Sequence, residues 1–75
     1  MNPTQCRMAR AALGLSAADL ARLAGIGYAT VARFELGQNV QPGGVQAMRQ
    51  ALEAAGVLFI DNGQLAGGIV PPRGD

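Results

Sequence analysis

Apolar residues recur with the period of a helix over most of the chain, and capping residues, glycines and prolines divide this pattern into segments. The first segment opens at residues 2–4, where Asn or Thr can cap free amide groups and proline is tolerated in a first turn. Cys6, Ala9 and Leu13 then fall on one helical face. Gly14 is the expected C-terminal cap, so the pattern predicts a first helix that ends there.

Two shorter helices are predicted next. Ser16 begins the second helix, and Asp19 three residues on comes close to the capping-box pattern. Gly25 stops this helix after about two turns. The third helix covers residues 28–35, with two apolar side chains facing inward, and Gly37 terminates it.

A fourth helix is predicted after a loop at residues 37–44, which is rich in Gly, Gln and Asn. It starts near residues 42–44, where two glycines should fray its first turn, and Gly56 caps its end. Its apolar stripe has helical spacing and consists of Val45, Met48, Leu52 and Ala55.

After the fourth helix the pattern changes to that of strands. Residues 57–60 are apolar strand formers, residues 61–63 are a turn signal, and residues 68–70 fit a return strand. This hairpin either covers the core of its own chain or pairs its open edge with a partner chain. We favour pairing with a partner chain, because a two-stranded ribbon is only marginally stable alone and the hydrophobic core of the domain is small.

Composition limits the protein to one small, mainly α domain of 75 residues. The net charge is +1, and all six cations are arginines, five of them in the first 50 residues. There is one cysteine, Cys6, expected in the core, and no histidine, so a disulfide within the chain or a metal site is not expected. No apolar run is long enough to span a membrane and no signal peptide is visible, which favours a cytoplasmic protein without cofactors. We see no plausible pair of a nucleophile and a base in the sequence, so we do not expect an enzyme.

The segment from Ala17 to Leu36 meets the packing demands of a helix-turn-helix motif. Ala21 supplies a small residue where two helices cross, and Gly25 supplies a turn residue that tolerates positive φ. The apolar anchors have the required spacing and are Leu20, Ala24, Ile26, Val31 and Phe34.

Residues 14–25 and 30–37 resemble the phage repressors, Cro proteins and bacterial relatives of the Xre family, and the likeness extends weakly over residues 6–60. The resemblance implies a lambda-repressor-like helix-turn-helix domain of four to five helices that binds double-stranded DNA as a dimer. We therefore expect this domain at residues 1–56, a strand or hairpin extension for dimerisation at 57–70, and a disordered tail at 71–75.

The resemblance also implies roles for single residues. Base contacts would come from the exposed face of the third helix, at Tyr28, Ala29, Ala32 and Arg33. Arg33 is the strongest of these, because its guanidinium fork can pair with guanine O6 and N7. Contacts to the DNA backbone would come from Arg10, Ser16, Ala17, Thr30 and Gln38. Arg10 would also pair with Glu35 in a structural lock between the first and third helices. The other helical arginines, Arg7, Arg22 and Arg49, are expected on solvated faces.

Two departures from the family pattern bear on affinity. Relatives often have Gln where this chain has Ala17, and a polar or basic residue where it has Leu36. Both changes remove phosphate contacts, so we expect weak, strongly dimer-dependent binding with a shallow salt dependence. The leading hypothesis is a sequence-specific transcriptional regulator, a repressor-type homodimer. The alternatives are an antitoxin that also holds a toxin, and a protein-interaction module with the same fold and little DNA binding.

Overall fold

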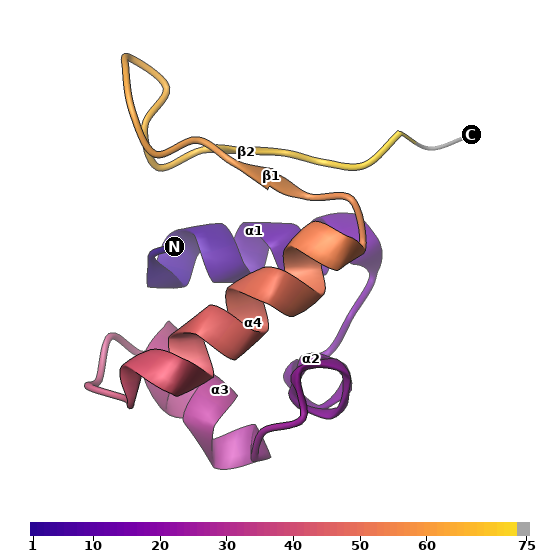
Figure 1. The fold of residues 1–75 in the computed structure, drawn as a ribbon, viewed down its shortest axis with the longest axis vertical. Coiled ribbons are helices and arrows are strands. Elements are labelled where there is room, and N and C mark those ends of the chain that lie inside the picture. Colours follow the sequence, from indigo (N-terminus) through magenta and orange to yellow (C-terminus); the bar gives the residue numbers. More distant parts are fainter. Residues whose placement is uncertain (74–75) are drawn as a thin grey trace.

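The structure, a computed structural model, describes residues 1–73 and is mainly helical (Figure 1). Its elements are the helices α1 (Pro3–Leu13), α2 (Ala17–Ala24), α3 (Tyr28–Glu35) and α4 (Pro42–Ala54), and the strands β1 (Leu58–Phe59) and β2 (Ile69–Val70). The strands are antiparallel and form a two-stranded sheet. The predicted fold class, helices followed by a short C-terminal hairpin, is therefore confirmed. Every described helix is too short or too polar to cross a lipid bilayer.

The helix ends follow the local signals of the sequence. Asn2 caps α1 through a reciprocal pair of hydrogen bonds with Gln5, 2.7 and 2.9 Å long. Ser16 and Asp19 form the same capping box at the start of α2, with bonds of 2.9 and 3.0 Å. Gly25 ends α2 in the left-handed region at φ 70°, which a residue without Cβ adopts readily. These bonds are local, which is why the predicted boundaries of both helices hold.

Helix α4 starts at Pro42, within the range predicted for it, and its first turn is formed. Its two glycines, Gly43 and Gly44, lie within the helix, and the Gly44 amide donates to Gln41 O at 3.0 Å. Packing against α3 accounts for this, because a Cβ at Gly44 would come within 3.1 Å of the Thr30 methyl group. The absence of a side chain therefore permits the close approach of α4 to α3, and this contact offsets the low helix propensity of glycine.

The core lies where the four helices meet, and α4 crosses the middle of the molecule between α1 on one side and α2 and α3 on the other (Figure 1). Its buried apolar members come from every helix and from the segment after α4; they are Cys6, Ala9, Leu20, Ala21, Val31, Phe34, Met48, Leu52 and Val57. Cys6 is thus a core residue, as expected. Because aromatic side chains are scarce, Phe34 is the one aromatic member of this buried cluster within the described residues, and the others are aliphatic or contain sulfur.

The hairpin is docked on α1 by a buried amide. Gln5 is 2% exposed, and its Nε2 donates to Ile60 O at 3.3 Å and to Gly68 O at 3.0 Å. The strand pairing continues through Ile60, whose amide donates to Gly68 O and whose carbonyl accepts from the Gly67 amide. Gln5 therefore joins the first turn of α1 to both sides of the hairpin, a role that the sequence analysis missed.

The hairpin is also tied to α4 by Arg49. Its guanidinium bonds Glu53 at 3.3 Å and Asp61 at 2.8 Å, and it lies 5.2 Å from the centre of the Phe59 ring. Arg49 is therefore half-buried and only partly solvated, because the hairpin folds back over α4 and brings Asp61 to it. By contrast, Arg22 is well exposed and pairs only with the neighbouring Asp19.

Beyond β2 the described chain runs along the end of α4. A Cβ at Gly56, where φ is 101°, would come within 2.8 Å of Pro72 Cβ, so Pro72 lies directly against Gly56. The disorder predicted for residues 71–75 stays a prediction, and residues 74–75 lie outside the described part of the chain.

Replacing Gln5 by Met should lower the free energy of unfolding by about 1–2 kcal/mol. Met keeps the length of the side chain but cannot donate to Ile60 O and Gly68 O or complete the cap with Asn2. Chemical denaturation measures the loss, and hydrogen exchange of the Ile60 and Gly67 amides should accelerate.

The matched control is Gln46→Met, at an exposed position of α4, which should change the free energy of unfolding by less than about 0.5 kcal/mol. Equal effects of the two substitutions would show that the buried amide does not hold the hairpin.

Candidate nucleic-acid interface

The outward face of α3 is presented by a helix that the core holds from behind. Val31 and Phe34 point into the core, whereas Tyr28, Ala29 and Arg33 are exposed. Tyr28 is 59% exposed. Three of the four predicted base-contact residues therefore lie on the open face of α3, and the fourth, Ala32, is half-buried.

Glu35, at the end of α3, is bound by a bidentate ion pair. Arg10 Nε lies 2.7 Å from Glu35 Oε2, and Arg10 Nη2 lies 2.6 Å from Glu35 Oε1. The two side chains are only 20% and 10% exposed. Arg10 Nη1 donates to Leu15 O at 3.1 Å, so each nitrogen of this guanidinium is engaged within the protein. The pairing of Arg10 with Glu35 is thus formed, while a contact of Arg10 with the DNA backbone stays a prediction.

Two more side chains of α1 reach Glu35, and the sequence analysis did not connect either with it. Cys6 Sγ donates to Glu35 Oε2 at 3.2 Å, and Arg7 Nη1 donates to the Glu35 carbonyl. Arg7 is exposed, as expected, and it also contacts the end of α3, because α1 runs beside it. Cys6 and Arg10 are four residues apart, a spacing that places both on one face of a helix. In the sequence, this spacing was the only indication that Cys6 and Arg10 could bind the same partner.

The ionisation of this cluster follows from its contacts. Burial acts to raise the pKa of Glu35, but the hydrogen bonds and charges of Arg10, Cys6 and Arg7 outweigh it and leave the pKa lowered. Burial, with help from the Glu35 carboxylate, raises the pKa of the Cys6 thiol to about 12. At neutral pH the carboxylate is therefore ionised and the thiol is protonated, which is the state that the hydrogen bond between them requires.

The residues predicted to contact the DNA backbone lie around α3, but they differ in solvent exposure and in whether they already bond within the protein. Ser16 is exposed, yet its hydroxyl caps α2, and Ala17 is half-buried. Thr30 is half-buried beside Gly44, and Gln38 is exposed just after α3. At the start of α2 the hydrogen bond from the Ser16 amide, with that from its hydroxyl, lowers the pKa of the Asp19 carboxyl. The protein's own carboxylate thus lies where an incoming phosphate would approach α2.

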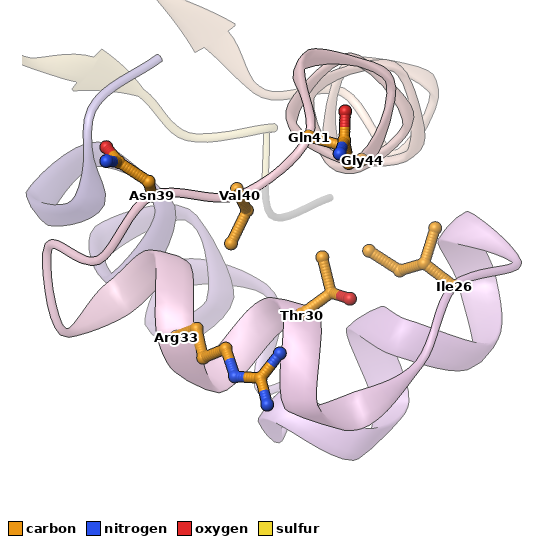
Figure 2. Close-up of a pocket in the computed structure, with 7 residues that line it drawn as sticks. All are labelled: Ile26, Thr30, Arg33, Asn39, Val40, Gln41 and Gly44. Carbon is orange, nitrogen blue, oxygen red and sulfur yellow. The ribbon is translucent and has the colours of Figure 1, made fainter.

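A hollow runs beside α3, where the chain turns from α3 into α4 (Figure 2). Its lining residues are Ile26, Thr30, Arg33, Asn39, Val40, Gln41 and Gly44. Figure 2 shows the Arg33 guanidinium on the outer side of α3, pointing away from Asn39 and Gln41. The two amide side chains were missed in the sequence, where residues 37–44 indicated only a loop.

Internal partners hold most of the cations of the helices. Arg7, Arg10, Arg22 and Arg49 each bond a carboxylate or a carbonyl oxygen. Within residues 1–73, Arg33 is the arginine of the helices that has neither an ion pair nor a hydrogen bond to the protein. The same residues contain no group of His, Cys, Asp and Glu side chains that could hold a metal ion. The guanidinium of Arg33, which the described residues leave unpaired, is therefore the main chemical feature of the α3 face.

Glu35 should make the stability of the fold depend on pH. Its pKa in the folded state lies below the ordinary value of 4.5, so the unfolded chain binds the proton more readily. The stabilisation is fully present above that ordinary value and is lost as the pH falls through the lowered pKa. We expect the free energy of unfolding to decrease more steeply below about pH 5 in the native protein than in Glu35→Gln.

Urea denaturation at a series of pH values between about 6 and 3 measures this difference. Glu53→Gln, at an exposed position of α4, is the control and should retain the steep decrease that Glu35 causes. Parallel pH profiles of the native protein and Glu35→Gln would contradict the prediction.

Comparison with known families agrees with this arrangement. A family model described as a helix-turn-helix domain matches residues 4–59, from the first turn of α1 to the end of β1. No curated protein matches the chain. The matched region is most of the chain and includes α2, the turn at Gly25 and α3. Such a domain indicates a DNA-binding regulator, and the chain belongs to the helix-turn-helix domain family.

Proposed function

We propose that this protein is a sequence-specific transcriptional regulator of the phage-repressor or Xre type, which binds double-stranded DNA as a homodimer through α3. The observation that carries the proposal is the Arg33 guanidinium, which lies on the open face of an anchored helix and has no partner within residues 1–73. An arginine that has no internal partner can pair with a base or a phosphate without first breaking an ion pair.

The anchoring of α3 supports recognition of a defined sequence. Val31 and Phe34 fix its inner face, and the bonds to Glu35 fix its C-terminal end. A recognition helix must hold its side chains in one orientation, because a hydrogen bond to a base edge depends strongly on distance and angle. The outward direction of Tyr28, Ala29 and Arg33 thus follows from contacts on the opposite side of the helix.

Electrostatics support a binding mode in which few phosphates are neutralised. The net charge is only +1, and most helical arginines are paired inside the protein. When a protein neutralises Z phosphates of duplex DNA, the logarithm of its binding constant falls linearly with the logarithm of the salt concentration. The slope is about −0.9Z. We therefore expect a shallow salt dependence, with polar contacts to the backbone from Ser16, Thr30 and Gln38 and from the amides of Asn39 and Gln41.

Arg33→Ala should abolish most of the preference for a specific duplex. Loss of one bidentate contact to guanine corresponds to about 1–3 kcal/mol of discrimination, or roughly 5- to 150-fold in affinity. The measurement is a salt series with fluorescent random duplexes and with duplexes selected from a random pool, starting at about 50 mM salt.

Arg73→Ala is the matched control, because it removes the same charge from an exposed residue after β2. It should leave the preference intact. If neither duplex binds the native protein at about 50 mM salt, the proposed function is wrong. If Arg33→Ala weakens all duplexes equally, Arg33 contacts phosphate and not a base.

For the homodimer, we propose the hairpin of residues 57–70 as the interface between two copies. One face of the hairpin packs on α1 and α4, while Leu58 and Val70, opposite each other on β1 and β2, are 63% and 45% exposed. A second copy is the occupant that fits, because the free edge of a strand is complementary to the same edge of another copy. Figure 1 shows the hairpin at the opposite end of the molecule from α3, so pairing there leaves the recognition face open.

Leu58→Asp should convert the dimer to a monomer, because a carboxylate in this apolar contact would lose its water on association. Sedimentation velocity measures the change. Leu23→Asp, at an α2 position of similar exposure, is the control and should leave the dimer unchanged. A dimer that persists in Leu58→Asp would contradict the assignment of the interface.

A second candidate is a protein-interaction module with the same fold. The observation that favours it is Leu36, which follows α3 and is 76% exposed at a position where a DNA contact would be polar. The salt series above separates the two functions, because an interaction module would bind neither duplex. An antitoxin role stays a prediction from the sequence.

A further inference from the structure

We infer that α3 recognises thymine methyl groups beside a guanine, so that each half of the bound DNA contains a G·C pair with an A·T pair within two base pairs of it. The inference rests on the proposed function and defines the class of DNA sequence that the same face would bind. It follows from which kinds of recognition chemistry the exposed residues of α3 possess and which they lack.

Each base presents a characteristic pattern in the major groove. Guanine pairs with Arg or Lys, adenine with Asn or Gln, cytosine with Glu or Asp, and the thymine methyl group contacts apolar side chains. Helix α3 contains no Asn, Gln or Lys, and its one acidic residue, Glu35, is held by Arg10 and Cys6. Recognition of adenine by a side-chain amide and of cytosine by a carboxylate is therefore absent from this helix.

Two modes of recognition remain on the open face. Arg33 provides a guanidinium for guanine, and Ala29 provides an exposed methyl group. The two residues are four apart, so they lie on the same side of the helix with Cβ atoms about 5–6 Å apart. Base pairs are spaced about 3.4 Å apart, so a base that Ala29 contacts is one or two steps from the guanine that Arg33 contacts.

The neighbours of Ala29 extend its apolar character. The side chain of Tyr28 is exposed beside it. Ala32, which is half-buried and lies one turn before Leu36, adds a second small side chain. Small residues let the helix backbone approach the base pairs closely, where a methyl group can displace water from a thymine methyl. The face is thus shaped for apolar contact around a single charged group.

The probe is a duplex selected from a random pool by the native protein, in which thymine is replaced by deoxyuracil one position at a time. Deoxyuracil keeps the base pair and removes only the C5 methyl group. The guanine is identified as the position whose preference disappears in Arg33→Ala. We expect replacement of the thymine nearest this guanine to weaken binding about fourfold in each half-site, the value for one buried methyl group.

Ala29→Ser identifies the side chain responsible. Its hydroxyl replaces the apolar contact, so the fourfold effect of deoxyuracil should disappear in this variant. Ala11→Ser makes the same change at an exposed position of α1 and should retain the effect. Circular dichroism shows whether both variants are folded.

The outcomes separate the two levels of the proposal. Absence of binding to any duplex of the pool would overturn the proposed function itself. Binding without thymine within two base pairs of the guanine would overturn only the present inference. The same holds if deoxyuracil has no effect, or if its effect persists in Ala29→Ser.

Discussion

The carboxylate of Glu35 determines how α3 is held. It accepts three hydrogen bonds from two residues of α1, two from Arg10 and one from Cys6, while Arg7 donates to the carbonyl of the same residue. A carboxylate that is 10% exposed is destabilising unless it is paired, and removing one partner would leave a charge uncompensated. The cluster therefore sets the angle between α1 and α3 and with it the direction of the exposed side chains of α3.

This cluster and the ion pairs of Arg22 and Arg49 together explain why a protein with six arginines has so little free positive charge. Internal contacts engage most of the helical arginines, and the carboxylate of Asp19 lies at the start of α2. The structure thus uses arginine mainly to connect its elements, and Arg33 remains as the available cation on the helices within residues 1–73. A face of this kind selects its ligand by the geometry of a few contacts more than by overall attraction.

The sequence predicted the features that depend on neighbouring residues. Capping at Ser16, the turn at Gly25 and the extent of α3 each depend on interactions within a few positions, so the pattern was sufficient. The pairing of Arg10 with Glu35 was expected from resemblance to a family and not from spacing. The contacts of Gln5 with Ile60 and Gly68, and of Arg49 with Asp61, could not be predicted, because they depend on how the hairpin folds back. The hollow near Asn39 likewise requires the three-dimensional path of the loop.

The position of Gln5 has a consequence for the order in which the molecule assembles. Its side chain lies in the first turn of α1, yet its backbone partners, Ile60 and Gly68, are 55 and 63 residues away along the chain. During synthesis, α2, α3 and α4 can therefore pack on one another before α1 has its final environment. Contacts between distant residues form late because closing a long loop carries an entropic penalty. The first turn of α1 thus completes its contacts only after β2 has been made.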